Sequence, residues 1–129
     1  MDKFRVLVVD DEEDFLETIV KRLRDRGLET HGVLSGEKAL QFLEGQDTDV
    51  VVLDVRMPGM DGIETLKEIK KRKPGIEVIM LTGHASVESG IQGMQLGAFD
   101  YVMKPVPLDE LLDKMRQAYE RKVIQEEQL

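Results

Sequence analysis

Five side chains that suit phosphoryl chemistry each stand at the carboxyl end of a short apolar run; they are Asp10, Asp11, Asp54, Thr82 and Lys104. Three carboxylates held together repel one another, and a hard divalent cation with oxygen ligands, such as Mg²⁺, relieves that repulsion. A carboxylate oxygen can attack a phosphoryl group and form an aspartyl phosphate. The metal and Lys104 would balance the charge of that transition state, and the Thr82 hydroxyl would donate to a phosphoryl oxygen. The set therefore predicts a phosphoryl-accepting site.

The elements that must position these residues are five short strand-like runs, four of them apolar, alternating with five segments of helical period. The run at 50–53 has no polar alternation, which is typical of a parallel strand covered by helices on both faces. The alternation predicts an α/β fold, a single (βα)5 doubly wound parallel sheet with the flavodoxin-like strand order 2-1-3-4-5. The carboxyl ends of its strands meet at one edge, so the five side chains should lie together. The polar run at 29–33 suits a strand at the sheet edge.

The composition of the chain argues against several classes of function. A chain of 129 residues with 41% hydrophobic and 34% charged residues has the profile of one soluble globular domain. Its net charge of −8 argues against direct binding of nucleic acid, and no apolar run approaches the roughly 18 residues that span a bilayer. The absence of cysteine excludes disulfides and thiol catalysis. We therefore expect a cytoplasmic protein without a membrane partner.

Two helical segments carry features with more than one explanation. The segment 86–96 contains Gly90 and Gly93, each costing about 1 kcal/mol relative to alanine, so it is intrinsically the weakest helix. The glycines either permit close packing or allow the helix to shift, and on the second explanation Gly90→Ala would stiffen it and alter activation. The basic stretch 70–73 either binds an acidic partner or complements the helix dipole, and we favour the dipole.

Four motifs together resemble the receiver domain of two-component response regulators. They are VLVVDDEE at 6–13, VVLDVRMPGMDG at 51–62, TGHA at 82–85 and GAFDYVMKP at 97–105. The resemblance covers residues 4 to about 120, and the combined motif set is specific. It implies a receiver domain at 1–120, followed by a helical C-terminal extension or linker at 121–129.

The resemblance also implies roles for the site residues. Asp54 would be the phosphoacceptor. Asp11 and Asp54 would bind Mg²⁺ (or Mn²⁺) directly, together with the backbone carbonyl of Arg56, and Asp10 would act through water.

The remaining roles concern the phosphorylated state. Lys104 would contact the phosphoryl oxygens, Thr82 would move toward them, and Tyr101 would turn inward as the aromatic switch residue. The Lys104–Pro105 peptide bond would be cis. Arg56 and His84, two residues beyond Asp54 and Thr82, would set the lifetime of the phosphorylated state; the alternative is that both point to solvent.

The function that the resemblance implies is a phosphorylation-dependent signalling switch that catalyses its own phosphorylation and slow autodephosphorylation, without being a conventional enzyme. The phosphoryl group would come from a sensor histidine kinase, a phosphotransfer protein of a phosphorelay, or a small phosphodonor. The fourth helix, fifth strand and fifth helix would form the surface for an effector domain, a target protein or a homodimer. The TGHA stretch and the helical extension resemble receivers that precede transcription-activating ATPase domains.

Two alternatives remain open from the residues. A metal-dependent phosphohydrolase of the haloacid dehalogenase type also uses a strand-end Asp, a Thr and a Lys. Such enzymes carry a second Asp where this chain has Arg56, and the chain has no room for a cap domain. The other alternative is an interaction module that is never phosphorylated, but such a module would normally have lost one of the site residues.

Overall fold

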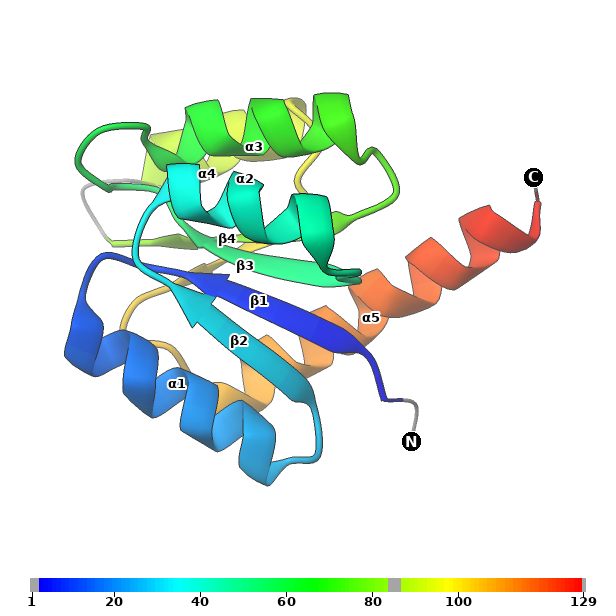
Figure 1. Ribbon diagram of the computed structural model, residues 1–129, viewed down its shortest axis with the longest axis horizontal. Helices are drawn as coiled ribbons and strands as arrows, with labels where there is room; N and C mark the ends of the chain where they lie inside the picture. The colour runs from blue at the N-terminus through cyan, green and yellow to red at the C-terminus, as the bar shows by residue number, and fades with distance from the viewer. Residues whose placement is uncertain (1–2, 84–86, 129) are drawn as a thin grey trace.

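The structure, a computed structural model that describes residues 3–83 and 87–128, contains one five-stranded sheet. All strand pairs are parallel, and the strand order is β2-β1-β3-β4-β5 (Figure 1). The strands are β1 (Arg5–Val9), β2 (Glu29–Val33), β3 (Val50–Asp54), β4 (Glu77–Thr82) and β5 (Asp100–Met103). The predicted fold class and strand order are confirmed, and the polar strand β2 lies at an edge as expected.

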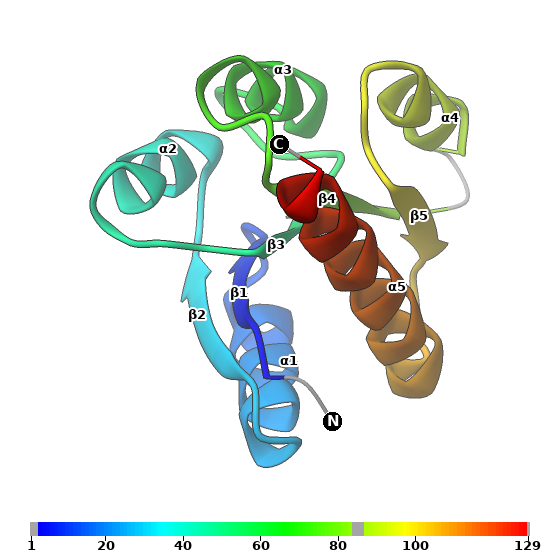
Figure 2. The same cartoon turned by 90° about the vertical axis from the view of Figure 1, so that its right-hand side faces the viewer.

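Helices cover both faces of this sheet. They are α1 (Glu13–Asp25), α2 (Gly36–Gly45), α3 (Gly62–Arg72), α4 (Val87–Gln95) and α5 (Leu108–Glu127). Figures 1 and 2 show α1 and α5 on one face and the other three helices on the opposite face. Within the described residues, no helix combines the length and the apolar character needed to cross a bilayer.

The core is divided by the sheet into two apolar clusters. Val6 and Val8 of β1 pack with α1 and α5, whereas Leu7 and Val9 pack with the helices of the other face. The run 50–53 in β3 is fully buried, with two of its residues in each cluster. Because both faces are covered, this strand shows no polar alternation in the sequence.

Two helices begin at side chains of the types that favour an N-cap, a serine and an aspartate. The Ser35 hydroxyl accepts a hydrogen bond from the backbone N–H of Lys38 at 3.2 Å, and Asp61 accepts one from that of Glu64 at 2.9 Å. Each cap satisfies a backbone donor that the helix itself leaves without a partner. These caps fix where α2 and α3 start, and therefore where the loops that precede them end.

The helical character expected beyond residue 120 is present, because α5 continues to Glu127 and projects past the sheet (Figure 1). Its last turns are tied to the amino-terminal edge of the sheet. Arg121 donates to both carboxylate oxygens of Glu77, whose side chain is only 3% exposed, and its guanidinium lies 4.7 Å from the Phe99 ring. Lys122 lies 3.7 Å from Asp49. The extension is therefore packed against the domain as far as these contacts reach.

Residues of the basic stretch at 70–73 make hydrogen bonds and ion pairs within the protein. Lys70 donates to the backbone carbonyl of Ile76 at 2.6 Å and lies 3.6 Å from Glu77. Arg72 forms an ion pair with Glu68, one turn earlier in α3, at 3.1 Å. These contacts support the explanation that the cations stabilise the end of α3.

Candidate functional site

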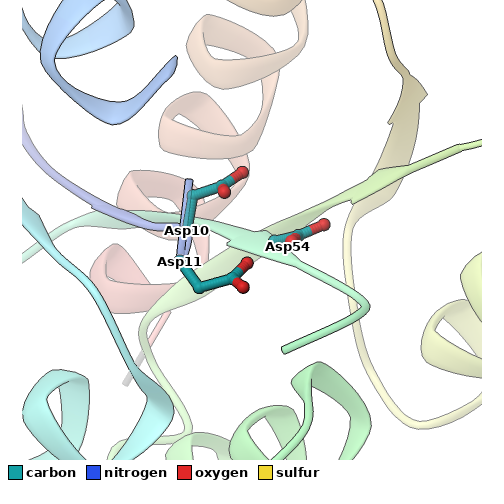
Figure 3. A group of neighbouring side chains, drawn as sticks. All are labelled: Asp10, Asp11 and Asp54. Atoms are coloured by element: carbon teal, nitrogen blue, oxygen red, sulfur yellow. The ribbon is translucent and has the colours of Figure 1, made fainter. Parts of the chain in front are cut away.

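Three carboxylates meet at the carboxyl ends of β1 and β3. Oxygens of Asp10, Asp11 and Asp54 all lie within 4.8 Å of one another, and Figure 3 shows the side chains directed to the same side. The strand register explains this meeting, because β1 and β3 are neighbours and pair Val9 with Leu53. Asp10 and Asp54 are buried, whereas Asp11 is exposed. This edge is the switch point of the sheet, where ligands bind in open α/β folds.

Asp10 is held at both of its oxygens. The backbone N–H of Glu12 donates to Oδ1 at 2.9 Å, and the Lys104 ammonium donates to Oδ2 at 2.7 Å. A fully buried carboxylate needs such partners, because leaving it unpaired would be costly. Asp10 therefore fixes the position of Lys104 relative to β1.

Lys104 follows β5 and brings a positive charge to the three carboxylates. Its Nζ lies 3.2 Å from Oε1 of Glu12 and 3.6 Å from Oδ1 of Asp54, and it stands 4.6 Å from the centre of the Phe15 ring. Burial disfavours the charged ammonium, but the hydrogen bond to Asp10 and the charge of Asp54 outweigh it and raise the pKa of Lys104. Lys104 is therefore positively charged at neutral pH.

Asp54 is the carboxylate whose ionisation is most disturbed. Burial, followed by the negative charge of Asp10, raises its pKa to about 6, against the opposing influence of Lys104. One ammonium thus does not compensate three neighbouring carboxylates. A divalent cation bound by Asp11 and Asp54 would supply the missing positive charge, and an all-oxygen ligand set suits Mg²⁺. The residues present fit that ion.

Thr82 ends β4 beside this cluster with an unpartnered hydroxyl. The residue is fully buried, and its Oγ1 has no hydrogen-bond partner within the described residues. Its backbone carbonyl accepts from the N–H of Lys104 at 2.7 Å, which aligns the ends of β4 and β5. A buried hydroxyl without a partner costs free energy in this state. A new acceptor nearby would therefore stabilise the protein through Thr82.

Gly90 of α4 packs directly against Thr82 and Tyr101. A Cβ atom at Gly90 would lie 2.8 Å from Cγ2 of Thr82 and 3.3 Å from Cγ of Tyr101. The structure thus favours close packing as the reason for this glycine. Gly90→Ala would do more than stiffen the helix, because its methyl group would push against both residues. α4 therefore contacts the two residues for which a switching role is expected.

The other expected site residues are placed as follows. The Lys104–Pro105 peptide bond is cis, which is the geometry that the resemblance implies. Arg56 follows β3 and is exposed, and Tyr101 is half-buried. His84 lies outside the described residues. Sequence reasoning assigned no role to Glu12 or Phe15, although the spacing Asp10–Glu12 is typical of an Asx turn at a strand end.

The family described as "Response regulator receiver domain" matches residues 6–116, and this chain belongs to it. The regulatory protein AtoC of Escherichia coli K12 is 42% identical over 107 residues, which are 83% of this chain and 23% of AtoC. The DNA-binding transcriptional regulator NtrC of the same organism is 37% identical over 113 residues, covering 88% of this chain and 24% of NtrC. The chain thus spans about a quarter of the length of these curated relatives.

Solved structures show the same likeness. A response regulator receiver domain from Clostridium thermocellum has a TM-score of 0.89 at 37% identity, with 94% of this chain and 98% of that chain covered. NtrX from Brucella abortus has a TM-score of 0.91 at 32% identity, with 98% of this chain and 29% of that chain covered. Family membership leaves the phosphohydrolase alternative without support.

Proposed function

We propose that this chain is a phosphorylation-dependent switch that accepts a phosphoryl group on Asp54. The observation that carries the proposal is the meeting of Asp10, Asp11 and Asp54 within 4.8 Å, with the Lys104 ammonium beside them. Membership of the receiver family supports the same function. A carboxylate with a raised pKa beside a fixed cation is a typical arrangement of a reactive site.

In the proposed reaction, an oxygen of Asp54 forms a bond to phosphorus, and the bond between phosphorus and the leaving group breaks. The electron pair of that bond departs with the leaving group, which is acetate for acetyl phosphate or the imidazole of a phosphohistidine. Lys104 neutralises charge that develops on the phosphoryl oxygens. Mg²⁺, held by Asp11, Asp54 and the backbone carbonyl of Arg56 with Asp10 acting through water, would supply further positive charge.

The proposed switch follows from the new charge. A phosphoryl group brings about two negative charges and strong acceptor oxygens. Thr82, whose hydroxyl has no partner in the described residues, would donate to one of those oxygens. Because Gly90 contacts both Thr82 and Tyr101, movement of Thr82 would change how α4 packs and allow Tyr101 to turn inward. The surface formed by α4, β5 and α5 would then present an altered face.

The partners we propose are a sensor histidine kinase or phosphotransfer protein on the input side, and an effector domain, target protein or second copy of this chain on the output side. The relatives named as transcriptional regulators support an effector that acts in transcription. We also propose a cytoplasmic location and no direct contact with nucleic acid or a membrane. The domain division at residue 120 stays a prediction, as do the lifetime-setting roles of Arg56 and His84.

The test is the intact mass of the protein after incubation with acetyl phosphate, in Mg²⁺ or in EDTA. We expect one added phosphoryl group in wild type with Mg²⁺, and none in EDTA or in Asp54→Ala. Asp47→Ala is the matched control, because Asp47 is an exposed aspartate that pairs with Arg5 at the start of β1, at the opposite edge of the sheet from the carboxylate cluster. If no adduct forms, beryllofluoride, a phosphoryl mimic that does not hydrolyse, separates rapid hydrolysis from a protein that is never phosphorylated. Failure to bind beryllofluoride as well would contradict the proposal.

A further inference from the structure

We propose that Glu12 and Phe15 are positioning residues that set how readily Lys104 reaches a phosphoryl group on Asp54. This inference rests on the proposed function and extends it to two residues outside the set named above. It assigns them opposite effects: Glu12 holds Lys104 back, and the Phe15 ring keeps Lys104 at the site.

The contacts of Lys104 carry the argument. Its Nζ is 2.7 Å from Asp10 and 3.2 Å from Glu12, but 3.6 Å from Asp54, which is longer than a hydrogen bond. The ammonium is therefore hydrogen-bonded to Asp10 and Glu12 of the β1–α1 connection, whereas its ion pair with Asp54 is longer. To contact a phosphoryl group on Asp54, it must turn away from at least one of its two hydrogen-bond partners.

Glu12 is the partner that Lys104 can leave more easily. The Glu12 side chain is 66% exposed, so its ion pair is weakened by water, whereas the Asp10 side chain is fully buried. This ion pair opposes phosphorylation because it holds the ammonium away from Asp54, and Glu12→Gln removes it.

Phe15 acts in the other direction. Its ring lies 4.6 Å from Nζ of Lys104, within the range in which an aromatic face attracts a cation. This attraction does not require a particular hydrogen-bond direction, so it persists while the ammonium turns from Glu12 toward Asp54. Phe15→Leu keeps an apolar side chain at this half-buried position but removes the aromatic face, whereas Phe15→Tyr retains it.

The experiment measures the rate of phosphorylation against acetyl phosphate concentration, in saturating Mg²⁺, from time courses of intact mass. We expect Glu12→Gln to raise the second-order rate constant about three- to tenfold, and Phe15→Leu to lower it by a similar factor. Phe15→Tyr should restore the wild-type rate. Glu13→Gln is the matched control, because Glu13 is a neighbouring exposed acid, and the ion pairs of Lys104 within the described residues are with Asp10, Glu12 and Asp54. We expect it to change the rate less than twofold.

A second set of variants separates positioning from a general structural effect. In a Lys104→Met background, Glu12→Gln and Phe15→Leu should no longer change the residual rate differently from Glu13→Gln, because both act through the ammonium. Urea midpoints confirm that each variant is folded.

The outcomes distinguish this inference from the proposed function. A wild type that takes up no phosphoryl group and binds no beryllofluoride overturns both. A wild type that is phosphorylated, with Glu12→Gln and Phe15→Leu behaving like Glu13→Gln, overturns this inference alone. Effects that persist unchanged without Lys104 overturn it as well.

Discussion

Asp54 should destabilise the metal-free protein at neutral pH, and Asp54→Asn should therefore stabilise it. The pKa of Asp54 rises from 3.8 to about 6 on folding, chiefly through burial. Well below pH 4 the carboxyl is protonated in both the folded and the unfolded state. Between about pH 4 and pH 6 the folded protein binds more protons than the unfolded chain, so the free energy of unfolding falls as pH rises.

The size of this effect follows from the same pKa. A rise from 3.8 to about 6 is about two pKa units, and each unit corresponds to about 1.4 kcal/mol. The side chain is only 9% exposed, so solvent screening removes little of this. We therefore expect the stability of Asp54→Asn relative to wild type to increase by about 2–3 kcal/mol between pH 4 and pH 7.5.

The assay is urea unfolding in EDTA at several pH values from 4 to 8, since urea is uncharged and does not screen the site. Asp47→Asn, with a side chain that is 87% exposed, serves as the control and should show no such trend. Adding Mg²⁺ should stabilise wild type by mass action and leave Asp54→Asn nearly unchanged. Equal stabilities of the Asp54→Asn variant and wild type across this pH range would refute the reasoning.

Three further predictions concern stability and switching. Thr82→Val should raise the free energy of unfolding by about 1 kcal/mol, because it removes a buried hydroxyl that has no partner within the described residues. It should also abolish the change in hydrogen exchange of α4 when beryllofluoride is added. A variant that is not stabilised and still responds to beryllofluoride would contradict this prediction. Gly90→Ala should lower the free energy of unfolding by about 1–3 kcal/mol through overpacking. Gly45→Ala is the control and should not lower it, because a Cβ added there meets nothing within 4 Å. Equal urea midpoints of the two variants would count against the packing argument. Arg121→Met should lower the free energy of unfolding in urea by about 2 kcal/mol, because it leaves the buried Glu77 with Lys70 as its partner. The loss should be much smaller in a Glu77→Gln background. Equal losses in both backgrounds would show that the ion pair is not responsible.

The sequence predicts most of the fold because several signals agree. The run 50–53 is apolar throughout, and full burial on both faces is the physical cause. Once alternating strands and helices imply a parallel sheet, the carboxyl ends of the strands must share one edge, which brings Asp10 and Asp54 together. The helix starts at Ser35 and Asp61 follow from local capping chemistry.

The strand starts were harder to predict. Three strands begin at a charged residue, Arg5, Glu77 or Asp100, one residue before the apolar runs 6–9, 78–81 and 101–103. A charged residue at such a position resembles a loop in the sequence. Each one is compatible with the sheet because it is ion-paired to a distant residue, as Asp100 is with Lys114 at 2.6 Å. Pairings between residues so far apart in the chain leave no local pattern to read.

The parts of the site that sequence reasoning missed have the same origin. Glu12 and Phe15 matter through Lys104, which follows them by about ninety residues. The close contact of Gly90 with Thr82 is likewise invisible in a helical pattern, where a glycine indicates only low propensity. Such contacts depend on how helices settle on the sheet, which local propensity does not determine.

The two ends of β4 should respond differently to ionic strength. At its amino end, Glu77 is 3% exposed and pairs with both Arg121, which is 42% exposed, and Lys70, which is 19% exposed, so dissolved ions reach only part of this cluster. Beside its carboxyl end, Lys104 shares its charge with Glu12, whose side chain is 66% exposed. Concentrated salt would therefore weaken the ion pair between Lys104 and Glu12 first, while the buried pair between Lys104 and Asp10 persists. The most salt-sensitive contact of Lys104 is thus the one that competes with the proposed phosphorylation site, so ionic strength would act on the site through Glu12.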